Sequence, residues 1–290
     1  MAGGGRGSRP FSSKARSVIT LVMMASAALL VFLIFNIVGL PTGNNIEIQK
    51  GGAIIALQNP QLVGRTTLLD GQVTPPKVQV LSWEPRAFVY YNMLSDEECD
   101  HLITLARPNM VKSTVVDSAT GRSKDSRVRT SSGTFLNRGQ DAIIKGVEEK
   151  IAQFTLIPVD HGEGLQVLHY EVGQKYEAHY DYFHDTFNTQ NGGQRIATVL
   201  MYLSDVAAGG ETVFPAAKVN NKTLDWEGQS KCAKAGLAVR PKKGMALLFW
   251  SLDPDTQKDP KSLHGGCPVI EGDKWSATKW LHIDKYSVPS

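Results

Sequence analysis

The chain has 290 residues, a formal net charge of +3 and 42% hydrophobic residues. This hydrophobic content is sufficient for a packed core, which excludes a wholly disordered protein. Four basic residues precede the first acidic residue, Glu47, so the excess positive charge lies at the N-terminus and the rest of the chain is nearly neutral. A nearly neutral domain lacks the basic surface of a nucleic-acid-binding protein, so we expect no nucleic-acid partner.

The segment Val18–Leu40 is an uncharged run of 23 residues. As a helix it would be about 34 Å long, enough to cross a hydrocarbon core of about 30 Å. A cleaved signal peptide is the alternative, but its apolar region is usually about 7–15 residues long and ends at a small-residue cleavage site, which is not evident here. We therefore predict a transmembrane signal anchor over residues 18–40. The basic residues before it predict a cytosolic tail at 1–17 and a single-pass type II protein.

This topology places the remaining chain in the lumen of the secretory pathway, and we expect the endoplasmic reticulum membrane, with the Golgi as the alternative. Residues 41–80 contain several Pro and Gly residues without periodicity, which predicts a luminal stem. A luminal domain would then occupy residues 81–290. Its sequon, Asn221-Lys222-Thr223, would be a glycosylation site in that compartment.

Three cysteines leave one unpaired if a disulfide forms. Cys99 falls within a predicted helix and is expected to be a small core residue. Cys232 and Cys267 could bridge in an oxidising lumen, and we state this pairing as a hypothesis.

In chain order, the luminal domain begins with two predicted strands, Val80–Trp83 and Ala87–Tyr91. Ser95 to Glu98 has the Ser-X-X-Glu pattern of a capping box, which predicts a helix that ends before Pro108. The segment Met110–Asn137 is polar and rich in Ser, Thr and Gly, and we predict a long functional loop there.

A second helix is predicted at Gln140–Phe154, with four apolar residues at helical spacing that would face the core: Ile143, Ile144, Val147 and Ile151. After Gly164, eight short strands are predicted: Leu165–Tyr170, Glu177–Tyr180, Ile196–Leu203, Thr212–Phe214, Ala238–Pro241, Ala246–Trp250, Ser262–Gly265 and Lys274–Ile283. Many short strands after two helices are typical of a double-sheet jelly roll with helices on one outer face. We therefore predict a mainly β protein with flanking helices (α+β).

The tripeptide His179-Tyr180-Asp181 has the spacing of a metal site. Residues i and i+2 of a strand point to the same side, so His179 and Asp181 could grip one ion. The pattern alone is a weak signal, and a third ligand must come from another strand. His264 is the candidate, which would complete the two-histidine, one-carboxylate triad that holds Fe(II) and leaves positions open for a 2-oxo acid and O₂. The carboxylate of Asp181 argues against a halogenase, which would lack it.

Six short motifs surround this triad: Tyr170-Glu-Val-Gly-Gln-Lys-Tyr176, His179-Tyr-Asp-Tyr-Phe-His184, Gly193-Gln-Arg195, Gly209-Gly-Glu-Thr212, His264-Gly-Gly-Cys-Pro268 and Lys274-Trp275. On these motifs, the chain from about Trp83 to Ser290 resembles the prolyl 4-hydroxylases of the 2-oxoglutarate/Fe(II) dioxygenases, most closely the membrane-anchored plant type. The resemblance implies a double-stranded β-helix over about residues 162–285 with the metal inside.

The resemblance also implies how the co-substrate binds. Lys274 would be a catalytic-site residue beside the three metal ligands and would anchor the distal carboxylate of 2-oxoglutarate. A buried ammonium needs a counter-charge, which an acid ligand supplies. By the same resemblance, Tyr170 and Thr212 would form hydrogen bonds with 2-oxoglutarate.

The peptide site is implied in the same way. Tyr176, Arg195 and Trp280 would lie beside the substrate, and the polar loop that carries Arg127 and Arg129 would close over it. Proline-rich chains adopt an extended left-handed helix without internal hydrogen bonds, and aromatic grooves bind such chains at low entropic cost.

The expected activity is hydroxylation of peptidyl proline to trans-4-hydroxyproline in proline-rich secretory glycoproteins, of the extensin and arabinogalactan type. The reaction would use Fe(II), 2-oxoglutarate and O₂ and release succinate and CO₂, with L-ascorbate restoring oxidised iron. One alternative is a dioxygenase of the same chemistry that acts on another substrate. The other is a non-catalytic, lectin-like luminal jelly roll with structural histidines.

Overall fold

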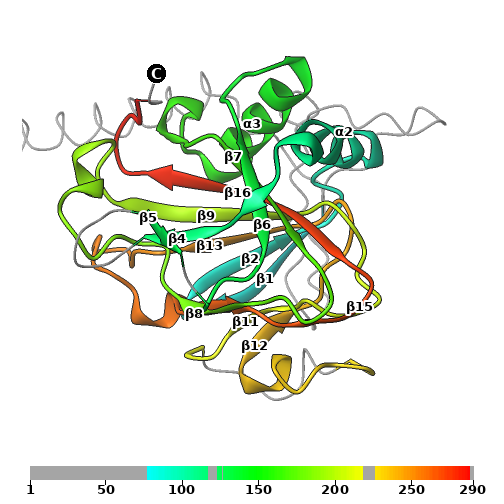
Figure 1. The fold of residues 1–290 in the computed structure, drawn as a ribbon. Helices are drawn as coiled ribbons and strands as arrows, with labels where there is room; N and C mark the ends of the chain where they lie inside the picture. Colours follow the sequence, from blue (N-terminus) through cyan, green and yellow to red (C-terminus); the bar gives the residue numbers. More distant parts are fainter. Residues whose placement is uncertain (1–76, 117–122, 126, 218–225, 288–290) are drawn as a thin grey trace, which may run out of the picture. The chain divides into compact units, whose positions relative to one another are not determined.

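The computed structural model describes residues 77–116, 123–125, 127–217 and 226–287 (Figure 1). The predicted tail, signal anchor and sequon at Asn221 lie outside these residues, as does the stem up to residue 76. The predicted stem was too long at its C-terminal end, because a strand begins at Val78. Among the described residues, no helix is both long and apolar enough to cross a bilayer.

Two antiparallel sheets form the framework of the domain. The large sheet has, in order across it, β1 (Val78–Trp83), β2 (Arg86–Tyr90), β13 (Ala246–Trp250), β9 (Arg195–Tyr202), β16 (Lys274–His282), β7 (Leu165–Tyr170), β6 (Ser132–Leu136) and β3 (Val111–Lys112). The small sheet has the order β12 (Leu237–Val239), β11 (Thr212–Phe214), β14 (His264–Gly266) and β8 (Tyr176–His179). Phe214 and Val239 of the small sheet pack with Val89 and Phe249 of the large sheet, so the two sheets share a core. This is the predicted jelly-roll arrangement.

Two helices, α2 (Asp96–Ala106) and α3 (Ala142–Thr155), cover the other face of the large sheet (Figure 1). The predicted capping box is present at α2, where Ser95 Oγ accepts a hydrogen bond from Glu98 N and the Glu98 carboxylate accepts one from Ser95 N. Within the described ranges, five short 3-10 helices lie in the connections: η1 (Arg107–Asn109), η2 (Val159–His161), η3 (Asn188–Gln190), η4 (Ala233–Ala235) and η5 (Pro260–Ser262).

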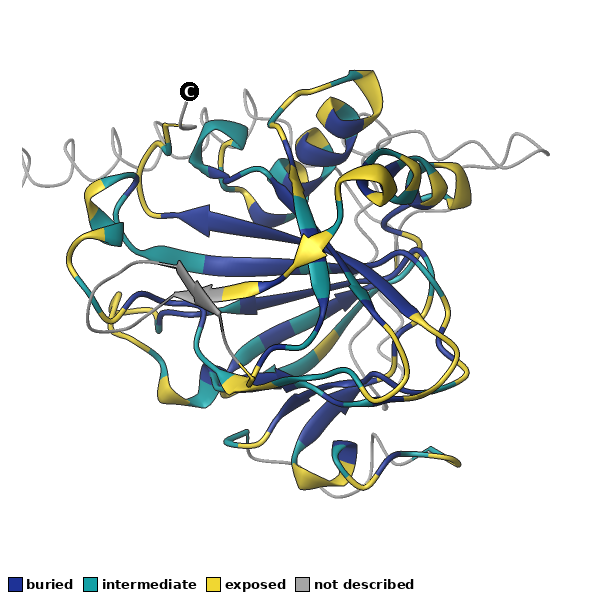
Figure 2. Ribbon diagram, in the orientation of Figure 1, coloured by how far each residue is buried: buried dark blue, intermediate teal, exposed yellow. Residues whose placement is uncertain are grey.

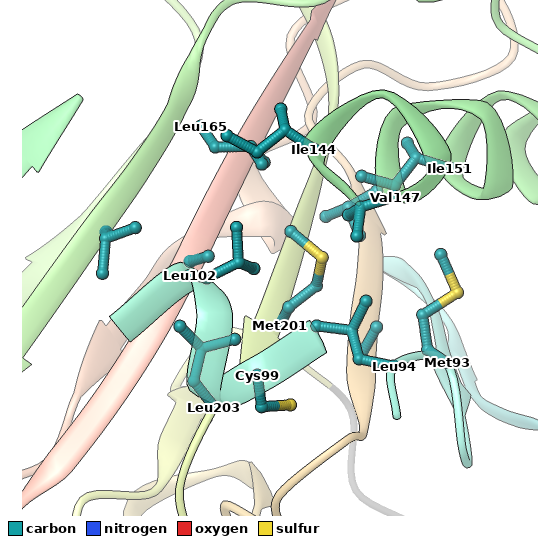
Figure 3. Packing of buried hydrophobic residues seen from close by; sticks show 14 of the residues in the cluster. Met93, Leu94, Cys99, Leu102, Ile144, Val147, Ile151, Leu165, Met201 and Leu203 are labelled. Atoms are coloured by element: carbon teal, nitrogen blue, oxygen red, sulfur yellow. The ribbon is translucent and has the colours of Figure 1, made fainter. Parts of the chain in front are cut away.

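The core between the helices and the large sheet is apolar. Figure 3 shows Ile144, Val147 and Ile151 of α3 pointing toward Leu102 of α2 and Met201 of β9. Burial of such side chains is the main stabilising contribution to this layer. One residue of the predicted core set is wrong: Ile143 is 37% exposed, because it lies at the edge of the apolar stripe of α3.

The strand β16 separates this core from the interior between the sheets. All nine of its residues are buried, and the strand is dark blue in Figure 2. Side chains alternate across a strand, so Lys274, Thr278 and Trp280 line the interior pocket while Trp275 and Leu281 pack in the helix-facing core.

The predicted strands after Gly164 are all present with ends shifted by at most two residues, and two were missed: β10 (Ala208–Gly209) and β15 (Val269–Glu271). The predicted loop Met110–Asn137 is wrong as a whole. It contains β3 and β6 of the large sheet and a separate pair, β4 (Thr114–Val116) and β5 (Ser123–Asp125). Gly133 of β6 is a residue type depleted from strands, but pairing of β6 with β7 supplies the hydrogen bonds that hold it extended.

Candidate active site

Three predicted metal ligands converge at one end of the small sheet. His179 ends β8 and His264 begins β14, and the two are directly opposite each other in the register. Asp181 lies in a bend two residues after His179, so the expectation that both belong to one strand is wrong. The bend nevertheless places each Asp181 carboxylate oxygen 3.5 Å from Nε2 of one histidine. The ligand atoms all lie within 4.8 Å of one another, close enough to hold one ion.

The two imidazoles are oriented for metal binding. His179 Nδ1 is 2.8 Å from the Glu177 carbonyl, and His264 Nδ1 is 2.9 Å from the Ser262 carbonyl. Each Nδ1–H can donate only to its carbonyl, which leaves the Nε2 lone pair facing Asp181. A backbone carbonyl that fixes the imidazole in this way is the usual support of a histidine ligand.

The charges of the triad also suit a cation. Burial lowers the pKa of His264 to about 4, so this imidazole is neutral at neutral pH. Burial opposes ionisation of Asp181, but the adjacent His264 and His179 hold the pKa of its carboxyl well below the usual value. The Thr198 hydroxyl donates a hydrogen bond to Asp181 Oδ2 at 2.7 Å. Two imidazoles and one carboxylate are a donor set that fits Fe(II).

Lys274 lies at the other end of the interior pocket. It is 3% exposed, and its Nζ donates a hydrogen bond to the Gly210 carbonyl at 2.8 Å. Burial lowers the pKa of Lys274 to about 8, against the opposing effect of the Glu211 carboxylate. Within the described part of the chain, no carboxylate lies within 4 Å of this ammonium. An anionic ligand would supply the missing counter-charge.

The same pocket contains the other two residues predicted to bind 2-oxoglutarate. Tyr170 and Thr212 line it, and the Thr212 hydroxyl accepts a hydrogen bond from the Tyr202 hydroxyl at 2.8 Å. Thr212 can therefore donate its own hydrogen to a further acceptor. Leu168 and Leu200 line the pocket as well, so it offers apolar contacts in addition to polar groups.

A second cavity of about 430 Å³ adjoins the triad and opens to the surface. Its walls include four of the five predicted peptide-contact residues: Tyr176, Arg129, Arg195 and Trp280. Arg127 does not line it; this residue lies in a separate depression with Glu171 and Gln174. The cavity and the pocket share His179 and Asp181, so the metal position faces both spaces.

Comparison with known proteins decides the family. Residues 165–282 match the model of the 2OG-Fe(II) oxygenase superfamily. "Probable prolyl 4-hydroxylase 3" of Arabidopsis thaliana is 69% identical over 72% of this chain and 74% of its own length. "Probable prolyl 4-hydroxylase 10" of the same plant is 56% identical over 96% of this chain and 95% of its own length. The chain belongs to the prolyl 4-hydroxylase family.

Family membership confirms the resemblance to the prolyl 4-hydroxylases, and it makes the protein a 2-oxoglutarate- and Fe(II)-dependent dioxygenase. It also removes the alternative of a non-catalytic jelly roll. Among solved structures, the viral collagen prolyl hydroxylase of Paramecium Bursaria Chlorella virus-1, in its 2OG complex, is 31% identical, covering 67% of this chain and 94% of that one, with a TM-score of 0.49.

In this hydroxylase the cavity wall is supported by charges that the sequence did not reveal. The Arg195 guanidinium lies 3.9 Å from the Trp280 ring centre, and its Nε donates to Glu163 Oε1 at 2.6 Å. His282 Nε2 is 2.9 Å from the same Glu163 oxygen. The sequence predicts no role for His282, which is 1% exposed. One signal could have drawn attention to it: His282 lies an even number of positions from Lys274 and Trp280, so on one strand all three would point to the same side.

Two buried donors of the hydroxylase point to a missing acceptor. The indole Nε1 of Trp280 and the Nε of Arg129 are buried and have no hydrogen-bond partner among the described residues. A buried donor without a partner is costly, so both would gain from a bound carbonyl.

The cysteines lie as the sequence hypothesis stated. The sulfur atoms of Cys232 and Cys267 are bonded, 2.09 Å apart, which confirms the pairing and ties the segment around η4 to the end of β14. Cys99 is free and buried on α2, and burial raises the pKa of its thiol to about 12. It is therefore a core residue and not a reactive thiol.

Proposed function

We propose that this enzyme hydroxylates peptidyl proline to trans-4-hydroxyproline in proline-rich secretory glycoproteins of the extensin and arabinogalactan type. One observation carries the proposal: the triad lies between a small pocket that ends at the Lys274 ammonium and a larger cavity walled by aromatic side chains. A dicarboxylate would enter the pocket and a peptide the cavity, and both would meet at the same metal position.

His179, Asp181 and His264 would hold the iron. When bound, Fe(II) supplies the oxidation chemistry in which 2-oxoglutarate and O₂ are converted to succinate and CO₂ while a C–H group of proline becomes C–OH. The protein binds and orients 2-oxoglutarate and the peptide, and it excludes water from the site. Lys274 pairs with the distal carboxylate of 2-oxoglutarate, and the hydroxyl groups of Tyr170 and Thr212 donate hydrogen bonds to it.

On the cavity side, the residues match an extended chain that has unpaired carbonyls. The Tyr176 ring stacks on His179 at 3.6 Å between ring centres, and the Arg129 guanidinium lies 4.7 Å from the same ring. A proline ring packed against Tyr176 would therefore lie beside the metal position. The unpartnered Trp280 Nε1 is suited to donate to a carbonyl of the peptide, because a polyproline-type chain leaves its carbonyls free.

The cellular setting is part of the proposal. The uncharged run at residues 18–40 supports a type II anchor in the endoplasmic reticulum membrane, with the dioxygenase domain in the lumen and the Golgi as the alternative. The bond between Cys232 and Cys267 fits an oxidising compartment. L-Ascorbate would serve there as the reductant that returns oxidised iron to Fe(II).

Mass spectrometry of a Ser-Pro-rich peptide tests this function. The full-length protein in detergent is incubated with Fe(II), 2-oxoglutarate, ascorbate and the peptide, and we expect one added oxygen per modified proline together with stoichiometric succinate. The His179→Ala variant should give neither product. Succinate release that ignores all proline peptides but responds to another substrate would favour the alternative dioxygenase and overturn the proline assignment.

A further inference from the structure

The predicted anchor Lys274 is the first residue of its strand and is paired on one side only. On one side of β16, the ladder with β7 ends at the pair Lys274–Tyr170. On the other side, the ladder with β9 ends two residues later, at Ser276–Tyr202. Strand ends are the parts of a sheet that open most readily. The residue that must be held in one place is therefore at the end that would fray first.

A cluster on the opposite face of β16 holds this end in place. The Asp273 carboxylate oxygen Oδ2 lies 2.7 Å from His169 Nε2 on β7 and accepts a hydrogen bond from Trp275 Nε1 at 2.9 Å. The Trp275 ring stacks on His169 with 4.2 Å between ring centres, and the Arg107 guanidinium lies 5.1 Å from Trp275. The two neighbours of Lys274 in the chain are thereby fixed to β7 and to the end of α2.

The backbone on either side of Lys274 is fixed as well. Trp275 N donates to Ser204 Oγ at 2.9 Å, and Leu203 N donates to the Trp275 carbonyl at 2.9 Å. These bonds continue the contact with the β9 side beyond the last ladder pair. Because side chains alternate along the chain at this strand, holding Asp273 and Trp275 on the side away from the pocket makes Lys274 point into the pocket.

We propose that Asp273 is a positioning residue for 2-oxoglutarate: with His169 and Trp275 it clasps the start of β16 and holds Lys274 at the end of the pocket. Nothing in the known roles of the triad or of Lys274 requires an exposed aspartate whose side chain is 55% accessible and faces away from the pocket. An ammonium on four rotatable bonds binds a carboxylate tightly only if its strand and rotamer are fixed beforehand. The clasp supplies that preorganisation from outside the pocket.

The test compares two acids that differ only at the far end. Both 2-oxoglutarate and 2-oxobutyrate have the 2-oxo acid group that faces the metal, but only 2-oxoglutarate has a distal carboxylate for Lys274. Calorimetry under anaerobic conditions gives the dissociation constant of each acid for the full-length, Fe(II)-loaded protein. We expect Asp273→Ala to weaken 2-oxoglutarate binding roughly tenfold and 2-oxobutyrate binding by less than about twofold, as for loss of a hydrogen-bonded charge.

Further variants separate positioning from general loosening. Asp273→Asn keeps an oxygen acceptor and should restore most of the lost affinity, and the rate at saturating 2-oxoglutarate should stay unchanged in both variants. His169→Gln should weaken 2-oxoglutarate binding, whereas His101→Gln is a matched control, since His101 forms an equally short 2.7 Å pair with Asp141 far from the pocket. Equal weakening of both acids, or no change with Asp273→Ala, would overturn the proposal.

Because the role of Asp273 depends on Lys274 as the anchor, Lys274→Met is included. If Lys274→Met removes the preference for 2-oxoglutarate over 2-oxobutyrate and the Asp273 variants keep it, only the clasp is refuted. If Lys274→Met keeps the preference, the anchor assignment in the proposed function fails first and the clasp fails with it.

Discussion

The two buried lysines of β16 differ in what balances their charge. Lys279 faces the helices, is 1% exposed and forms an ion pair with the equally buried Glu148 of α3. Lys274 faces the pocket, is 3% exposed and donates a hydrogen bond to a backbone carbonyl. The Glu211 carboxylate acts on its ammonium only through space, without an ion pair. Burial lowers the pKa of both lysines. The comparison separates a charge that is satisfied within the fold from one that is left for a ligand.

The largest expected effect comes from breaking the internal pair. Glu148→Gln leaves the Lys279 ammonium buried without its partner, which should lower the free energy of unfolding by about 3–5 kcal/mol. Chemical denaturation measures this loss. The variant protein that remains folded should bind 2-oxoglutarate with unchanged affinity, and a stable Glu148→Gln protein would contradict the assigned role of the pair.

The matching change at the other lysine should act on binding instead of stability. Lys274→Met removes the counter-charge for the distal carboxylate, and we expect the Michaelis constant for 2-oxoglutarate to rise about 100-fold, equivalent to about 2.7 kcal/mol. The melting temperature without ligand should stay the same or rise, since an unpaired buried charge is lost. Lys274→Arg is the control, because it keeps the charge. An unchanged Michaelis constant in Lys274→Met would remove the assignment.

The pH dependence sharpens the contrast further. The folded-state pKa of Lys274 is about 8, below the ordinary 10.5, so the free pocket loses its positive charge as the pH rises through 8. The protonated fraction falls from about one half at pH 8 to about one tenth at pH 9, so affinity for 2-oxoglutarate should fall about fivefold over this range. The same lowered pKa affects the stability of the ligand-free fold. Below pH 8 the buried charge destabilises the folded state, and this destabilisation is relieved as the pH rises from 8 toward the ordinary pKa of 10.5. In Lys274→Met this fall in 2-oxoglutarate affinity with rising pH should be absent. Binding titrations of both proteins across this pH range measure the difference.

The smallest effect is expected when both members of the internal pair are replaced together. Glu148→Leu with Lys279→Met exchanges a buried ion pair for apolar side chains of similar size, which should change stability by only about 1 kcal/mol in either direction. Denaturation of the double variant beside the two single variants measures the coupling. A double variant as unstable as Glu148→Gln would show that the pair does more than satisfy its own charges.

The sequence predicted the pocket side of this comparison better than the helix side. His179, Asp181 and Lys274 belong to short local motifs, which are weak signals alone and became specific through their resemblance to the prolyl 4-hydroxylases. Glu148 could not be paired with Lys279, because an ion pair between residues so far apart in the chain has no local pattern. A clue was present, since Glu148 follows Val147 within the apolar stripe of α3.

The strands of Met110–Asn137 were missed for a related reason. β6 is held by its hydrogen bonds to β7, and pairing between distant segments leaves no periodic signal in polar residues. The support of Lys274 by Asp273 was also invisible, because it depends on His169 of another strand. Local motifs therefore pointed to the candidate ligands, and contacts between distant segments determine what holds those residues in place.

The complete burial of β16 has a consequence for variation along the chain. All nine of its residues are buried, and successive side chains point alternately into the pocket and into the helix-facing core. The effects of substitutions along this strand should therefore alternate. Changes at the core-facing positions should reduce the yield of folded protein, and changes at the pocket-facing positions should give folded protein with impaired turnover. Substitution of these nine residues one at a time would thus separate the positions that stabilise the helix-facing core from the positions that form the pocket.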